Sequence, residues 1–139
     1  MERTQINLVA KGIKKLAFLL IVAASFAACK KEKEVSKTIV GNWEGKWGNA
    51  NQAPTNFLKF EFGSNGEMNR INEQGEVIAS GTYSANGVQF ECTYTHTAAH
   101  GGQTHKIGGL YTDFEGKIVG TWGYSPSNAN GGTIELNKQ

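Results

Sequence analysis

The chain has 139 residues and a net charge of +2, from 14 Lys and Arg against 12 Asp and Glu. This length accommodates one ordinary domain, alone or with a targeting segment, and is short for a two-domain enzyme. Charged residues make up 19% and Gly outnumbers Pro by 18 to 2, which fits neither a disordered charged chain nor a Pro-rich linker. Two cysteines are too few for a disulfide-dense mini-protein, and a charge of +2 is too small for nucleic-acid binding.

The first 28 residues have the pattern of an export signal rather than of a folded core. Four basic residues precede the apolar run 16–26, whose 11 residues are well short of the roughly 20 that span a bilayer as a helix. Two alanines and Cys29 follow directly. This ending resembles the lipobox of bacterial lipoproteins, in which the signal is cleaved before a cysteine that has received a diacylglycerol group. A plain secretory signal and an uncleaved anchor are the alternatives.

The lipobox resemblance implies that Cys29 carries the membrane anchor. Acyl chains such as palmitate hold a protein stably when two or more of them are buried in the bilayer. The charged run that follows predicts a solvated tether over residues 29–37. It also resembles the signal that sends some lipoproteins of Gram-negative bacteria to the outer leaflet. We therefore expect a lipid-anchored protein of the bacterial cell envelope, in the outer membrane.

The positive charge of the chain lies in its first 37 residues. Residues 38–139 contain six basic and nine acidic side chains, a net charge of −3. The charge of the whole chain is therefore evidence about delivery to a membrane, and the domain itself is expected to be mildly acidic.

From residue 38 onward, apolar and polar residues alternate between Gly and Asn positions, and no stretch has the spacing of an amphipathic helix. Phe60 and Phe62, for example, lie on one face of an extended chain and Glu61 on the other. The pattern predicts eight strands, over 38–47, 56–63, 67–73, 76–84, 88–97, 104–113, 117–124 and 132–137.

The connections between these strands are mostly typical of hairpins. The segments 64–66, 85–87 and 115–116 each end in a Gly that can take the positive φ of a tight antiparallel turn. In the third predicted strand, Met68 and Ile71 fall on opposite faces, which predicts either a bulge or that this segment is not a strand.

Eight short antiparallel strands without a covering helix favour an up-and-down barrel that closes on itself, because closure removes the exposed edges of the sheet. A sandwich is the alternative, although it usually needs longer crossing connections. In a simple meander, the tight turns share one end of the barrel, whereas the longer connections 48–55, 98–103 and 125–131 share the other. The tether enters at the tight end, so we expect the loop-rich mouth to point away from the membrane.

Two short motifs resemble those of the lipocalins. Residues 41–43 match the G-x-W signature of the first lipocalin strand, and residues 112–114 (T-D-F) resemble the T-D-Y motif between the sixth and seventh strands. The resemblance implies a lipocalin-like (calycin) β-barrel over residues 38–139, with avidin-type barrels as a neighbouring alternative. Lipocalins cover the conserved tryptophan with an arginine after the last strand, where this chain has only Lys138.

Any binding site is expected among the aromatic residues that face the barrel interior. Trp47, Tyr94 and Tyr124 are predicted to lie nearest the open mouth, where their polar tips would meet a ligand. His96 and Trp122 share the same inward face and complete the candidate site. The same rings also fit a core that fills the barrel, so both interpretations stay open.

Cys92, His96, His100 and His105 come closest to a metal cluster, because the hairpin could bring them to one mouth. Their spacing matches no standard zinc pattern, so we expect no metal and no cofactor. Cys92 is expected to be a buried free thiol. The sequence has no catalytic motif, and its single aspartate, Asp113, falls at a turn of the tight end, so we expect no enzyme.

The sequence thus predicts a membrane-anchored, non-catalytic lipoprotein whose small barrel binds a small apolar or aromatic molecule. The alternative is an envelope protein-interaction module or inhibitor, in which a side-chain-filled barrel displays the long loops to a protein partner.

Overall fold

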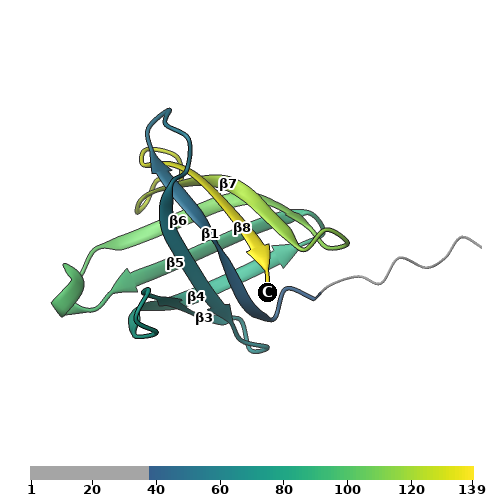
Figure 1. The fold of residues 1–139 in the computed structure, drawn as a ribbon, viewed down its shortest axis with the longest axis horizontal. Helices are drawn as coiled ribbons and strands as arrows, with labels where there is room; N and C mark the ends of the chain where they lie inside the picture. The colour runs from purple at the N-terminus through teal and green to yellow at the C-terminus, as the bar shows by residue number, and fades with distance from the viewer. Residues whose placement is uncertain (1–37) are drawn as a thin grey trace, which may run out of the picture. The chain divides into compact units, whose positions relative to one another are not determined.

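The computed structural model describes residues 38–139, which form eight antiparallel strands wound into a closed barrel (Figure 1). The predicted leader and tether, residues 1–37, lie outside the described residues. The strands follow one another around the barrel in chain order. They are β1 (Gly41–Asn49), β2 (Asn56–Phe62), β3 (Glu67–Ile71), β4 (Val77–Asn86), β5 (Gln89–His96), β6 (Thr104–Thr112), β7 (Lys117–Tyr124) and β8 (Gly132–Lys138), with a 3-10 turn, η1 (Ala98–His100), between β5 and β6.

The barrel closes where the first strand meets the last. Trp47 of β1 lies opposite Asn56 of β2 on one side and opposite Ile134 of β8 on the other. Closure leaves neither β1 nor β8 as an open edge, so neither presents a row of unpaired backbone groups. The predicted all-β, up-and-down barrel is confirmed. Residues 38–139 contain no helix long and apolar enough to cross a membrane.

Several strand ends differ from the sequence prediction. β1 begins at Gly41 rather than at residue 38, because the φ of +119° at Gly41 breaks the regular extended chain before it. It continues to Asn49 rather than 47, because β8 pairs with it as far as Gly132. β4 likewise runs to Asn86 rather than 84. The predicted bulge is confirmed, since β3 changes register against β4 just before Ile71, where the strand ends two residues early.

Inward-facing positions of all eight strands form one continuous core. Val88, the first residue of the strand predicted over 88–97, is 63% exposed because it precedes β5 in the turn after Gly87. The core residues are Trp43, Leu58, Phe60, Phe62, Met68, Ala79, Phe90, Cys92, Tyr94, Ile107, Tyr111, Ile118, Trp122, Ile134 and Leu136.

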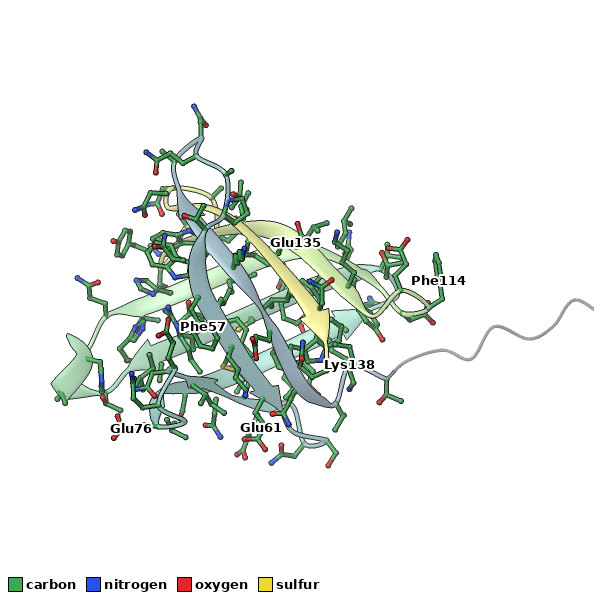
Figure 2. The ribbon with its side chains drawn as sticks, viewed as in Figure 1. Phe57, Glu61, Glu76, Phe114, Glu135 and Lys138 are labelled. Carbon is green, nitrogen blue, oxygen red and sulfur yellow. The ribbon has the colours of Figure 1, made fainter. Side chains whose placement is uncertain are left out.

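Trp43 seals the end of the barrel at which β1 begins. Its indole is fully buried, and Nε1 donates a hydrogen bond to the Ile39 carbonyl oxygen at 2.7 Å. The Lys138 ammonium lies 5.7 Å from the centroid of the indole ring and donates to the carbonyl oxygens of Thr38 and Val40. Figure 2 shows Lys138 at the end of β8, beside the start of β1. Lys138 therefore covers Trp43 from the end of β8.

The two ends of the barrel differ in their connections. At the end that Trp43 seals, the turns β2–β3, β4–β5 and β6–β7 are tight, with positive φ at Gly66, Gly87 and Gly116. Phe114 projects from the β6–β7 turn at this end (Figure 2). The connections β1–β2, β3–β4, β5–β6 and β7–β8 share the opposite end and include the three longest. The predicted division into a tight end and a loop-rich end is confirmed.

The core and the closing strand pair of the barrel lie within one segment of the chain. Every core residue lies between Trp43 and Leu136. The pairing of β1 with β8 completes the sheet within the same segment. We refer to residues 38–139 as the barrel unit.

Candidate functional site

A cavity of about 360 Å³ opens at the loop-rich end of the barrel. This volume lies in the lower part of the range of small-molecule pockets, which is about 300–1,000 Å³. All five candidate site residues predicted from the sequence line it. The complete lining is Trp47, Asn49, Leu58, Arg70, Tyr94, His96, His100, Gln103, His105, Trp122, Tyr124 and Ile134.

The barrel is filled at one end and hollow at the other. Leu58, Tyr94, Trp122 and Ile134 belong both to the core and to the cavity lining, so the cavity borders directly on the packed core. On the core side, Phe62 packs against Phe90 at 5.5 Å and against Phe60 at 5.8 Å between ring centroids. Each of the two expectations from the sequence, an aromatic pocket and a packed aromatic core, therefore describes part of the barrel.

Two tryptophans form a rigid wall of the cavity. The rings of Trp47 and Trp122 meet edge to face, with centroids 5.3 Å apart and planes at 85°. Nε1 of Trp122 donates a buried hydrogen bond to the Gly48 carbonyl oxygen at 2.9 Å. Behind this ring lies Gly131, where a Cβ atom would come within 2.5 Å of the indole. The wall is thus held by packing and by a hydrogen bond, and its apolar surface is available to a ligand.

A polar group lies opposite this aromatic surface. Arg70 of β3 places Nη1 3.1 Å from Nε2 of His96, and its guanidinium carbon is 5.9 Å from the centroid of the Tyr94 ring. Arg70 is always protonated, so it donates and His96 Nε2 accepts. The proton of His96 is then on Nδ1, which donates to the Gln103 carbonyl oxygen at 3.3 Å. Burial first, and the Arg70 charge second, lower the pKa of His96 and favour this neutral form.

His105 of β6 is the most unusual residue of the cavity. Its side chain is only 8% exposed, and neither ring nitrogen has a hydrogen-bond partner. Burial, together with the nearby charges of His96 and Arg70, lowers its pKa to about 4. The imidazole is therefore neutral at pH 7, with one donor and one acceptor unsatisfied, an arrangement that costs about 1–3 kcal/mol for each buried group. Its neighbours are four aromatic rings at centroid distances of 4.9–5.6 Å, those of Tyr94, His96, Trp122 and Tyr124.

Arg70, Asn49 and Gln103 line the cavity but were not among the site residues predicted from the sequence. Arg70 lies opposite Phe60 in the β2–β3 register, and both residues face inward. The sequence contained a signal for Arg70, because it lies two residues after Met68 in the third predicted strand. Alternation along a strand places two such residues on the same face, so an inward Met68 implies an inward Arg70. Gln103 belongs to the β5–β6 connection, and only the tertiary structure brings a connection over the cavity.

The proposed cluster of Cys92 with three histidines does not form. Among the residues that the structure describes, no three His, Cys, Asp or Glu side chains are grouped so as to hold a metal ion. Cys92 pairs with Ile107, whereas His105 pairs with Tyr94, so the thiol lies one layer deeper than the cavity. It is free and 2% exposed, as expected, and burial raises its pKa.

The closed eight-stranded barrel agrees with the architecture that the lipocalin resemblance implies. Comparison with protein-family models, with curated protein sequences and with solved structures gives no match. The two motifs at 41–43 and 112–114 both lie at the tight end of this barrel.

Proposed function

We propose that this protein is a non-catalytic lipoprotein of the bacterial envelope whose barrel binds a small aromatic molecule. The observation that carries the proposal is the cavity of about 360 Å³, in which a wall of Trp47 and Trp122 faces a few convergent polar groups. An apolar or aromatic surface with a small number of placed polar groups is the usual composition of a ligand pocket.

The character of the lining supports binding without chemistry. Among the described residues that line the cavity, none is a Ser, Thr, Cys, Asp or Glu. The histidines that are most enclosed are neutral at pH 7, and neither has a hydroxyl or thiol partner to activate. The lining therefore supplies the aromatic and polar groups that binding needs, but not the histidine-activated hydroxyl or thiol that nucleophilic catalysis needs.

The anchor is proposed from the leader and Cys29, whose pattern of basic residues, apolar run and small residues is typical of a lipobox signal. A lipidated Cys29 would hold the barrel unit at the surface of the outer membrane or on its periplasmic face, by acyl chains rather than by a spanning helix.

Ligand binding is tested with the barrel unit and a neutral aromatic dye, N-phenyl-1-naphthylamine, whose fluorescence rises in apolar sites. We expect saturable binding, and we expect the Trp47→Ala variant to bind about tenfold more weakly because it removes half of the aromatic wall. Phe114→Ala is the matched control, since Phe114 is an aromatic residue that is 52% exposed in the turn at the other end.

Binding of the dye that is equally strong in both variants would place it outside the cavity and contradict the proposal. No binding of the dye by a folded barrel unit would favour the alternative, a protein-interaction module that uses the loops around the cavity.

A further inference from the structure

We infer that the cavity selects an aromatic ligand bearing one carboxylate, which Arg70 and His105 hold at the polar side of the cavity. The inference rests on the proposed binding of a small molecule and adds the charge and chemical class of that molecule.

Arg70 has no carboxylate partner in the barrel. Among residues 38–139 the structure has one salt bridge, between Lys117 and Glu135 on the outer surface, and none that involves Arg70. No acidic side chain belongs to the cavity lining. The guanidinium contacts the neutral ring of His96 and lies over the ring of Tyr94, neither of which is an anion at pH 7. A partly buried cation without a counter-ion is unfavourable, and an anionic ligand would remove that cost.

His105 supplies a hydrogen-bonding group beside this cation. It lies against the same two rings as Arg70, since its ring centroid is 5.6 Å from that of Tyr94 and 4.9 Å from that of His96. Its two nitrogens are buried and have no partner. One carboxylate oxygen can accept from the imidazole N–H while the other accepts from the guanidinium, which places donors for both oxygens on one side of the cavity.

The rest of the cavity fits a flat ring. Trp47, Trp122 and Tyr124 present aromatic surface, and Leu58 and Ile134 add aliphatic surface to the lining. Aromatic pairs favour edge-to-face and offset contacts, which a ring placed against this wall can make. The volume is small for a ligand pocket, so one or two fused rings with a short acidic arm suit it better than a long acyl chain.

The test compares two ligands of nearly identical shape by calorimetric titration of the barrel unit at pH 7. Indole-3-acetate carries the carboxylate, whereas indole-3-acetamide keeps the ring and the arm without the charge. We expect the acid to bind at least about tenfold more tightly, because charge-assisted hydrogen bonds are about twice as strong as neutral ones. Decanoate, an aliphatic carboxylate, is expected to bind more weakly than indole-3-acetate.

Variants locate the effect. Arg70→Gln should abolish the preference for the acid and leave the affinity for the amide within about twofold. Lys106 follows His105 in β6 but does not line the cavity. Lys106→Gln removes the same charge as Arg70→Gln and should keep the preference for the acid. If Arg70→Gln fails to fold, as judged by circular dichroism, the two ligands still decide the question on the parent protein.

The outcomes separate the two proposals. If neither indole ligand binds, the inference is wrong, and binding of the neutral dye decides whether small-molecule binding fails with it. If both bind with equal affinity and Arg70→Gln changes nothing, the cavity binds aromatic molecules but the anion inference is wrong. Tighter binding of decanoate than of indole-3-acetate, with the same dependence on Arg70, would overturn the aromatic part of the inference.

Discussion

At the scale of single residues, His105 makes the stability of the barrel depend on pH. Its pKa in the fold is about 4, lowered chiefly by burial, whereas a histidine in an unfolded chain has a pKa near 6.5. Between these values the unfolded chain binds more protons than the folded one, so acid favours unfolding. The stabilising contribution is complete above about pH 6.5 and is lost as the pH falls toward 4. His96, whose pKa is lowered as well, adds to the effect in the same direction.

We predict that the free energy of unfolding of the barrel unit falls by about 2 kcal/mol or more between pH 7 and pH 4, since one pKa unit corresponds to about 1.4 kcal/mol. In the His105→Phe variant the fall should be clearly smaller, because an apolar ring of similar size has no proton to gain. Urea denaturation at the two pH values measures both. Lys106→Gln, one position along β6, serves as the control, and an equal fall in His105→Phe would assign the acid sensitivity to other groups.

At the scale of elements, Gly45 determines how closely β1 can approach β8. A Cβ atom at this position would lie 1.9 Å from the carbonyl oxygen of Glu135, a backbone atom that cannot move aside alone. Gly45 lies between Trp43 and Trp47 on the inward face and pairs with Leu136 of β8. A glycine within a strand commonly marks such a close approach or a sharp bend at the corner of a barrel.

Gly45→Ala is therefore expected to destabilise the barrel by about 2 kcal/mol or more, through the separation of β1 and β8 that overpacking requires. Conformational preference alone would give the opposite sign, because Ala loses less backbone entropy than Gly in a strand. Lys46→Ala, at the next and exposed position, should stay within about 0.5 kcal/mol of the parent. Thermal and urea unfolding of the two variants test this, and a Gly45→Ala barrel as stable as the parent would contradict the steric argument.

At the scale of the whole molecule, the two ends of the barrel differ in structure and in the role that we propose for them. One end is filled and sealed by Trp43, with Lys138 connecting the last strand to the chain just before β1. The other end is open and carries the long connections. Because the chain enters the barrel at the sealed end, an anchor upstream would leave the open cavity facing away from the membrane. This orientation is part of the proposed function.

The anchor predicts how the full chain partitions in a bacterial host. Cys29→Ser should release the protein from the membrane fraction, because no acyl chain can be attached to a serine hydroxyl at a lipobox. Cys92→Ala should remain in that fraction, since Cys92 is a buried core residue. Immunoblots of separated membrane and soluble fractions show the result. Retention of Cys29→Ser in the membrane fraction would contradict lipidation and favour an uncleaved anchor.

Much of the fold could be predicted from the sequence because each signal is local. Phe60 and Phe62 alternate with polar residues over a span in which a strand forms, and Gly66, Gly87 and Gly116 stand where the tight turns need positive φ. Strand ends were less accurate. Asn49 extends β1 only because β8 is there to pair with it, and such a partner is not visible in the local pattern.

The candidate site was predictable in part for the same reason. Period-two alternation places Trp47, Tyr94 and Trp122 on inward faces whatever the details of the barrel. Arg70 was missed because the bulge obscured the face of β3, and His105 was considered only as a metal ligand. The alternation also cannot show how much of the interior stays empty, since that depends on how rings from different strands pack.

By itself, the sequence determined the fold class, the number of strands and the inward face of most of them, because these follow from alternation and turn chemistry along the chain. Only the tertiary structure decided how far β1 pairs with β8 and that the barrel is filled at one end and hollow at the other. It also brought Arg70 and His105 against the same rings of Tyr94 and His96. The physical reason is that cavities, burial and unpaired polar groups are properties of contacts between distant segments, which no local pattern contains.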